Sequence, residues 1–488
     1  MQIVHVSSEI LPWSKAGGLG DVSGALPPAL AARGHHVVTV APRYAEYEDA
    51  WDTGHTGGAW LFGSHHRVRF FHTRKAGVDH VFVDHPSFHR DGIYGDSNGA
   101  YGDNLFRFAL LSRVALQVPD LPIFEQDLSR AEDLVFHAND WHAALVPVLL
   151  DAVSRPAGRF LGVPSVLALH NVAHHGATTL DAFDGLDLAA RWKGTLTQYG
   201  ALSPLKGGVS TADQLITVSP TYAREIAEHR GHGLEPILSA RNQDLHGIVN
   251  GVGPEWDPAT DPRLPATYSA ADLTGKARCK RALQERFGLE VNPERPVFAF
   301  IGRLVHQKGL DLLEQLVPWL VARGGQVVLL GSGESRWEQW MFGVGGKFSG
   351  SVGTWVGYSE DLAHLMTAGA DLLLMPSRFE PCGLNQLYAL RYGTVPLVHA
   401  TGGLVDTVEP VDVQAGTGTG YRFWPYDAGA MRAAADAALR LFQDHPDAWR
   451  ALQLRGMAQT LDWDQAAAAY ERVYEQAAAR RRAILDAT

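Results

Sequence analysis

Lys15 and Asp21 flank a run of glycines near the start of the chain, in the stretch KAGGLGDV. Glycines let a backbone approach a ligand closely, and the N–H groups that open a helix attract anions. Lys15 adds a positive charge, and Asp21 offers an acceptor for a hydroxyl. The stretch has neither the Gly-Lys-Ser/Thr ending of a phosphate-binding loop nor G-x-G-x-x-G spacing. By itself it indicates either an anion site or a βα turn that binds nothing.

Two later segments bring further charges beside predicted helix starts. FIGRLVHQKGLD contains Arg303 and Lys308, a pair of cations suited to a diphosphate. SRFEPCGLNQL contains Glu380, Cys382 and Gly383 immediately before a helical pattern. Glu380 fits either a ligand-binding carboxylate or a simple acid at a helix start. Further along, TGGLVDTV again joins glycines to a helix start and predicts a second anion nest.

Polar residues also follow two apolar runs of the first half, in HANDWHA and LHNVAHHG. Asp140, His142 and His170 are therefore candidates for a site, although each alone fits a capping or core residue. Histidines are frequent between His137 and His175, yet none of them forms the H-E-x-x-H pattern of a zinc site. We therefore expect no metal.

The elements that must position these residues alternate between short apolar runs and helical patterns. MQIVHVSSE, HHVVTVAPRY, DLVFHAND and PSVLALHN read as strands, and GGLGDVSGALPPALAARG reads as a loop opening a helix. Such alternation predicts a parallel sheet covered on both faces. Parallel sheets of this type bind ligands beyond the carboxyl ends of their strands, which is where the polar clusters lie.

The pattern restarts at RPVFAFIGRL, so the sequence predicts an α/β protein with two doubly wound domains. We expect an amino-terminal domain over 1–247 and a second domain over 248–460, joined by the Gly- and Pro-rich segment 247–258. Residues 461–488 read as a long closing helix, which we expect to pack back on the first domain.

Composition restricts the class of protein. The net charge of −11 argues against a nucleic acid or an anionic membrane as partner. No apolar run is long enough to span a bilayer, and no signal peptide is evident. With only two cysteines, Cys279 and Cys382, the chain fits a reducing cytoplasm.

Taken together, these motifs resemble the bacterial glycogen synthase and plant starch synthase family. The resemblance rests on the Lys-x-Gly-Gly-Leu-Gly-Asp, Arg-Leu-x-x-Gln-Lys-Gly-Leu-Asp and Ser-Arg-Phe-Glu-Pro-Cys-Gly-Leu motifs and covers nearly the whole chain. It implies a GT-B fold, in which two Rossmann-like domains face each other across a cleft. It also implies transfer of glucose from ADP-glucose to the 4-hydroxyl at the non-reducing end of an α-1,4-glucan, with retention and without metal or other cofactor.

The resemblance assigns the donor to residues of both domains. Lys15 and the backbone at Gly17 and Gly18 are expected to meet the diphosphate and the sugar. Asp21 is expected to hold the ribose, and Tyr358, in the segment VGY, to lie against the adenine.

The same resemblance assigns the groups around the reacting centre. Arg303 and Lys308 are expected to stabilise charge on the departing ADP. Glu380 is expected to bind glucose hydroxyls and support the oxocarbenium-like centre. His170 is expected to contact the glucose 6-hydroxyl, with its main chain facing the anomeric carbon.

Five further residues match family positions. Cys382, Gly383 and Leu384 are expected to supply backbone contacts near the sugar and phosphate. Asp140 and Asn250 match other positions of the site. Retention leaves two routes open, with Glu380 as nucleophile or with front-face attack assisted by the leaving phosphate, and we favour the second.

Three positions depart from the family pattern: Gly253, where an aspartate is usual, and His174 and His175, where Tyr-Gln is common. They affect the expected hinge and acceptor side rather than the reaction. Two alternatives stay open. One is another enzyme of the same fold, such as a UDP-glucose-dependent transferase or a glucan phosphorylase. The other is a non-catalytic glycan-binding protein, against which the intact motifs argue.

Overall fold

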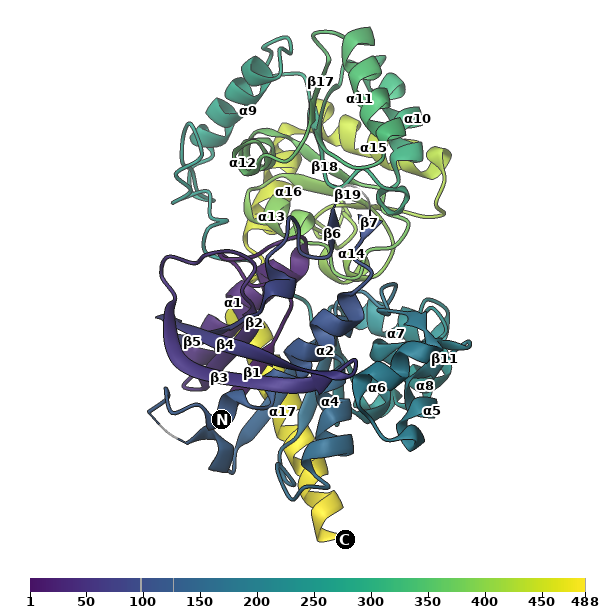
Figure 1. Cartoon of the computed structure of the whole chain (residues 1–488). Coiled ribbons are helices and arrows are strands. Elements are labelled where there is room, and N and C mark those ends of the chain that lie inside the picture. The colour runs from purple at the N-terminus through teal and green to yellow at the C-terminus, as the bar shows by residue number, and fades with distance from the viewer. Residues whose placement is uncertain (97–98, 126, 488) are drawn as a thin grey trace. The chain divides into compact units, whose positions relative to one another are not determined.

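The computed structural model describes residues 1–96, 99–125 and 127–487. The chain divides into two compact units. The first unit consists of Met1–Ile248 together with Trp463–Thr488, and the second unit is the continuous segment Val249–Asp462. The closing helix therefore belongs to the unit that contains the amino terminus (Figure 1).

The first unit is built on a mixed sheet with the strand order β14-β13-β9-β8-β1-β2-β5-β4-β3. The strands are β1 (Gln2–Val6), β2 (His36–Pro42), β3 (Trp51–Leu61), β4 (Ser64–Lys75), β5 (Val78–Asp84), β8 (Leu134–Asn139), β9 (Ser165–Leu169), β13 (Gln214–Thr217) and β14 (Leu245–Gly247). From β14 to β5 neighbouring strands are parallel, as the short, apolar and almost fully buried runs predicted.

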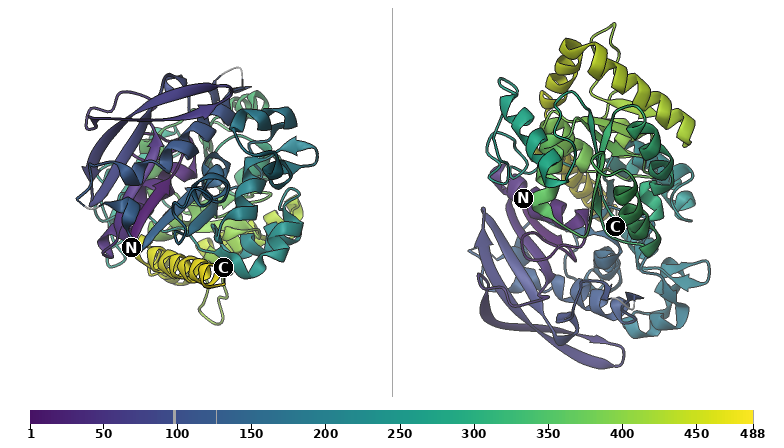
Figure 2. Two further views of the ribbon diagram at one scale, coloured as in Figure 1. Left: turned by 60° about the horizontal axis from the view of Figure 1, so that its bottom comes forward. Right: turned by 90° about the horizontal axis from the view of Figure 1, so that it is seen from above.

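The other edge of this sheet corrects the sequence-based expectation of an all-parallel sheet. The long strands β3 and β4 pair antiparallel with each other, and β4 pairs antiparallel with β5. They form the curved ribbon at one edge of the first unit in Figure 2. The sequence analysis missed β3 because WDTGHTGGAWL carries several glycines and few buried positions. An exposed edge strand lacks the apolar run that marks a central one.

The helices of the first unit cover the sheet. They are α1 (Gly18–Ala32), α2 (Asn104–Ala115), α3 (Asp140–Ala143), α4 (Leu145–Leu149), α5 (Lys193–Leu196), α6 (Pro204–Thr211), α7 (Pro220–Glu228), α8 (Glu235–Ala240) and α17 (Trp463–Asp486). Shorter elements are η1 (Pro86–Phe88), η2 (Val118–Asp120), η3 (Leu128–Arg130), the π-helical η4 (Leu150–Ser154), η5 (Leu180–Leu186), η6 (Ala190–Trp192), η7 (Asn242–Asp244), β6 (Gly95–Asp96), β7 (Gly99–Ala100), β10 (Thr178–Thr179), β11 (Thr197–Gln198) and β12 (Ala201–Leu202).

Helix α17 is part of the core of the first unit. It lies against α1, β9 and β13, and is the yellow helix beside the sheet in Figures 1 and 2. Tyr470 and Tyr474 are fully buried in one cluster with Ile3 from β1. On the outer side, Arg33 pairs with Glu471 at 2.8 Å. The buried aromatic face, rather than the ion pair, accounts for most of the attachment because exposed pairs contribute little.

The second unit contains a parallel sheet with the order β17-β16-β15-β18-β19-β20. The strands are β15 (Val297–Ile301), β16 (Gln326–Gly331), β17 (Val352–Val356), β18 (Leu372–Met375), β19 (Val395–His399) and β20 (Tyr421–Phe423). The helices are α9 (Thr274–Arg286), η8 (His306–Lys308), α10 (Leu310–Val321), α11 (Ser335–Lys347), α12 (Glu360–Gly369), α13 (Asn385–Arg391), α14 (Gly403–Thr407), α15 (Ala428–Asp444) and α16 (Pro446–Met457).

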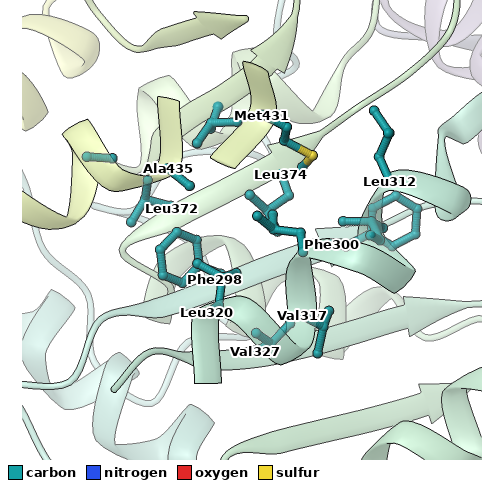
Figure 3. Packing of buried hydrophobic residues seen from close by; sticks show 14 of the residues in the cluster. Phe298, Phe300, Leu312, Val317, Leu320, Val327, Leu372, Leu374, Met431 and Ala435 are labelled. Atoms are coloured by element: carbon teal, nitrogen blue, oxygen red, sulfur yellow. The ribbon is translucent and has the colours of Figure 1, made fainter. Parts of the chain in front are cut away.

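One large apolar cluster holds this sheet to its helices. Figure 3 shows Phe298 and Leu374 of neighbouring strands meeting side chains from α10 and α15. Leucines and valines spaced along one face of α10 are almost fully buried, and Leu320 is completely so. Burying one such side chain contributes about 1.5–3 kcal/mol relative to leaving it in water. The cluster therefore fixes the strand ends from which the charged loops emerge.

Two negative findings apply to the described residues. Across 1–96, 99–125 and 127–487, no helix combines the length and apolar character needed to cross a bilayer. Over the same ranges, no group of three or more His, Cys, Asp or Glu side chains is arranged to hold a metal ion. Cys279 and Cys382 are both free and buried.

Candidate functional site

The glycine-rich loop after β1 is held by a carboxylate of the chain itself. Glu9 Oε2 accepts hydrogen bonds from the backbone N–H of Ala16 at 2.6 Å and of Gly17 at 2.9 Å. Tyr94 donates its hydroxyl to Glu9 Oε1 at 2.5 Å. In this structure the Gly17 N–H is therefore used by Glu9, and the contact of the Gly17 backbone with the donor stays a prediction. Gly18 opens α1, and the first N–H groups of a helix have no partner within the helix.

Lys15 and Asp21 lie together beside this loop. Lys15 Nζ is 2.6 Å from Asp21 Oδ1, and their side chains are 34 % and 18 % exposed. The two residues, which the resemblance assigned to the diphosphate and the ribose, thus form an ion pair in this structure. Such a pair keeps the lysine ammonium near the helix start, where it adds to the positive end of the helix dipole.

A second group of candidates lies at the ends of β8 and β9, which neighbour β1 in the sheet. Asp140 Oδ1 accepts hydrogen bonds from the backbone N–H of His170 at 2.7 Å and of Asn171 at 3.3 Å. Asp140 has a φ of 52°, a left-handed conformation that is strained for a residue other than glycine. Burial raises the pKa of its carboxyl to about 7, against the effect of the two hydrogen bonds.

His170 is held through both its backbone and its ring. Its Nε2 is 2.9 Å from Oδ1 of Asn139, the last residue of β8. Burial lowers the pKa of His170 to about 4, so the ring is neutral at pH 7. His142, by contrast, is a core residue: it is buried, and its ring stacks on Tyr94 with centroids 4.7 Å apart.

In the second unit, the loops after β15 and β18 bring Lys308 to Glu380. Lys308 Nζ is 2.6 Å from Glu380 Oε2, and the side chains are 19 % and 8 % exposed. Ser377 donates its hydroxyl to the same oxygen at 2.9 Å. Gly309 follows Lys308 with a φ of 74°, and a Cβ there would lie 1.9 Å from the Pro376 carbonyl oxygen. Only glycine allows these two loops to approach this closely.

Arg303 also follows β15, and its side chain is exposed. It contributes no ion pair among the residues that the structure describes. Lys308 is thus held by a carboxylate, while the Arg303 guanidinium remains the more accessible of the two predicted cations. The two cations therefore differ in exposure, with Lys308 bound by Glu380 and Arg303 open to solvent.

The turn after Glu380 carries the remaining predicted residues. Burial raises the pKa of the Cys382 thiol to about 12, although a backbone hydrogen bond with Asn250 opposes this shift. The thiol is therefore protonated at pH 7 and is not a nucleophile. Gly383 has a φ of 74°, and Leu384 precedes the first residue of α13. A third loop, between β19 and α14, also contacts this turn, because the backbone N–H of Gly403 donates to the Glu380 carbonyl at 3.0 Å.

Two predicted residues lie at the margin of this group. Asn250 is buried, and within the described part of the chain its Oδ1 has no hydrogen-bond partner. A buried acceptor that lacks a donor within the protein is the kind of atom to which a ligand hydroxyl donates a hydrogen bond. Tyr358 follows β17 and is 76 % exposed.

Reasoning from the sequence assigned no role to three residues that hold these groups in place. They are Glu9, which binds the glycine-rich loop; Asn139, which binds the His170 ring; and Ser377, which binds Glu380. Each lies at or just beyond the carboxyl end of a strand, so strand ends were the available signal.

Two family profiles match the chain in the order of its units. Residues 2–240 match the profile described as "Starch synthase catalytic domain", and residues 282–450 match "Glycosyl transferases group 1". A solved catalytic domain of starch synthase IV from Arabidopsis thaliana, bound to ADP and acarbose, superposes with a TM-score of 0.88. It is 30 % identical, with 98 % of this chain and 99 % of that chain covered. The protein is thus a glycosyltransferase of the GT-B fold.

Curated relatives are more similar in sequence and cover almost the whole chain. A glycogen synthase of Anaeromyxobacter dehalogenans is 44 % identical, covering 99 % of this chain and all of the relative. Starch synthase 1 of Arabidopsis thaliana is also 44 % identical, covering 97 % of this chain and 76 % of the relative. The chain belongs to the family of bacterial glycogen synthases and plant starch synthases.

Proposed function

We propose that this protein lengthens glycogen by transferring glucose from ADP-glucose to the 4-hydroxyl at the non-reducing end of an α-1,4-glucan. The observation that carries the proposal is the buried Glu380 carboxylate, bound by Lys308 and Ser377 where three loops meet at the strand ends of the second unit. A solved relative with 30 % identity binds ADP and acarbose, which supports an adenine nucleotide donor and a glucan-like acceptor.

Departure of ADP develops negative charge on the diphosphate, and we assign its stabilisation to Arg303 and Lys308. Lys308 is already oriented by Glu380, so little reorganisation is needed during the reaction. Preorganised donors of this kind contribute about 10²–10³ in kcat each. In this proposal the cations of the chain carry the charge that a metal carries in other transferases, so no metal or cofactor takes part.

We assign the remaining donor contacts residue by residue. Asn250 Oδ1, which is buried and without a partner in the described structure, accepts a hydroxyl of the donor. The ribose is assigned to Asp21 and the adenine to Tyr358. The diphosphate is assigned to the Lys15 ammonium and to the N–H groups at the helix start at Gly18. The backbone groups of Cys382, Gly383 and Leu384 are assigned contacts near the sugar and the phosphate.

For the sugar itself we assign Glu380 and His170. Glu380 places negative charge beside the oxocarbenium-like centre, and His170 contacts the glucose 6-hydroxyl. Two hydrogen-bond donors on Glu380 Oε2, from Lys308 and Ser377, lower the nucleophilicity of this carboxylate. We therefore favour retention by front-face attack, with the leaving phosphate taking the proton of the incoming hydroxyl, over a covalent glucosyl-Glu380 intermediate.

The decisive experiment supplies purified protein and glycogen with ADP-[14C]glucose or UDP-[14C]glucose in the presence of EDTA and counts label in precipitated glucan. We expect incorporation from ADP-glucose alone. Incorporation from UDP-glucose alone would overturn the donor, and a requirement for added metal would overturn the role of the cations. Glucan binding without incorporation from either donor would identify a non-catalytic glycan-binding protein. We place the protein in the cytoplasm, which its two free, buried cysteines support.

A further inference from the structure

We propose that Asn139 is a positioning residue that fixes His170 in one tautomer, with the proton on Nε2 and the lone pair on Nδ1. In this form Nδ1 accepts a hydrogen bond from a hydroxyl of the donor glucose. The inference rests on the proposed function for the identity of that hydroxyl, but the tautomer itself follows from hydrogen bonds within the first unit.

The side chain of Asn139 is completely buried at the end of β8, and its amide is oriented by the neighbouring strand. Asn139 Nδ2 lies 3.0 Å from the carbonyl oxygen of Val6 on β1. A carbonyl oxygen only accepts, so the group that faces Val6 must be the NH₂. The reverse orientation would place two acceptor oxygens in contact in a buried site, which is strongly unfavourable.

The orientation of the amide determines the tautomer of His170. With the NH₂ directed at Val6, Asn139 Oδ1 is the atom that lies 2.9 Å from His170 Nε2. An amide oxygen accepts, so Nε2 must carry a proton. Because burial keeps His170 neutral, with a pKa of about 4, the other ring nitrogen carries none. Nδ1 is therefore an acceptor.

A third contact agrees with the same arrangement of protons. Asn139 Nδ2 is 3.1 Å from His5 Nε2, and this nitrogen accepts if His5 carries its proton on Nδ1. Burial lowers the pKa of His5 to about 3, so this ring is neutral and can accept. The NH₂ group of Asn139 thus faces Val6 and His5, and its oxygen faces His170.

The titratable groups that face His170 come from three elements. His5 lies on β1 and His137 on β8, while Asp140 and His142 lie on α3. Burial lowers the pKa of all three histidines, so none of them competes as a cation for the acceptor on His170. Asp140 contacts the backbone N–H of His170 rather than the ring. The ring proton is therefore controlled by Asn139.

The test is a double-mutant cycle on kcat/KM for ADP-glucose. Asn139→Leu keeps the approximate shape but removes the acceptor, and we expect a loss of about 10- to 100-fold, the scale found for partners that orient a functional imidazole. Asn139→Asp keeps an acceptor oxygen toward Nε2 and, with its buried carboxyl protonated, a hydroxyl donor toward Val6, so at pH 6 we expect activity within about threefold of wild type at the same pH. In a His170→Ala background, Asn139→Leu should have no further effect.

Gln214 provides a matched control in the same sheet. Gln214 is the first residue of β13, whereas Asn139 is the last residue of β8. Gln214 Oε1 is 2.8 Å from His246 Nε2, so Gln214→Leu removes the same kind of amide–imidazole contact at the amino-terminal end of a strand. We expect unchanged kcat/KM for this variant. Additive losses of Asn139→Leu and His170→Ala, or equal losses in Asn139→Leu and Asn139→Asp at pH 6, would show a merely structural role and overturn the proposal.

A spectroscopic measurement on the wild-type protein decides the tautomer even if Asn139→Leu fails to fold. In long-range ¹H–¹⁵N spectra of ¹⁵N-histidine-labelled protein, the His170 signals are those lost in His170→Gln. We expect the pattern of a proton on Nε2, and a proton on Nδ1 would overturn the inference. This measurement needs no turnover. A wild-type protein with no transfer from ADP-glucose would refute the proposed function and leave the tautomer to be judged separately.

Discussion

Asp140→Asn is expected to stabilise the first unit at neutral pH. The substitution keeps an acceptor for the backbone N–H of His170 and replaces only the ionisable oxygen. Burial raises the pKa of the Asp140 carboxyl from 3.8 to about 7, so its charged form is unfavourable in the folded protein. Asparagine carries no charge at any pH and avoids this cost.

The magnitude follows from the linkage between proton binding and folding. Each unit of pKa difference corresponds to about 1.4 kcal/mol, so the carboxyl weakens folding by at most about 4 kcal/mol once the pH exceeds both pKa values. Because the residue is only half-buried by surface area, we expect about half of this, roughly 2 kcal/mol. Stability from the raised pKa is fully present below about pH 4 and is lost as the pH rises to about 7.

Scanning calorimetry of wild type and Asp140→Asn between pH 5 and 8.5 tests this reasoning. We expect Asp140→Asn to unfold at a Tm about 5 °C above wild type at pH 8, with a much smaller difference at pH 5. Asp181→Asn, at an acidic residue of η5 in the same unit, is the control and should show no such trend. A Tm difference that is the same at all pH values, or a lower Tm for Asp140→Asn at pH 8, would refute the account.

Other expected outcomes follow from the contacts of single side chains. Lys308→Met removes the cation beside Glu380 and should lower kcat/KM about 10²- to 10³-fold in the radiolabel assay. Lys347→Met, at an exposed position of α11, is the control and should not lower it. A Lys308→Met protein as active as wild type would refute the assignment of Lys308 to the diphosphate. Iodoacetamide at pH 8 should leave Cys382 unmodified in the folded protein, because burial holds its pKa at about 12, and should label it in urea; rapid labelling of folded protein would contradict this. Tyr474→Phe removes the hydroxyl 2.7 Å from His137 Nδ1 and should destabilise the first unit by about 1 kcal/mol without altering kcat, as measured by urea unfolding.

The sequence predicted the architecture well because the central strands are unambiguous. β1, β8 and β9 are short apolar runs that end in polar clusters, and parallel sheets bind ligands at those ends. Asp140 and His170 could be placed near each other on this ground alone, and their hydrogen bond confirms that they meet.

The rest depended on contacts that no local pattern specifies. The N–H groups of the glycine-rich loop were predicted to attract an anion, and in this structure those of Ala16 and Gly17 donate to the Glu9 carboxylate. From the sequence alone, a loop whose N–H groups bind a carboxylate seven or eight residues upstream looks the same as a loop whose N–H groups bind a phosphate. In the same way, the partner of Lys308 lies 72 residues away, on a loop whose position depends on the packing of the whole sheet.

The division of the chain also fixes the order in which the molecule can be completed during synthesis. The second unit is one continuous segment, whereas the first unit needs Trp463–Asp486 to cover Ile3 and its neighbours. Domains of nascent chains ordinarily fold in the order in which they emerge. Here the strands around Ile3 must wait for α17, and their apolar surface stays uncovered while the second unit is already complete. A chain cut after Asp462 would contain the whole second unit but leave the apolar surface around Ile3 uncovered, so we expect such a fragment to bind chaperones through its first unit.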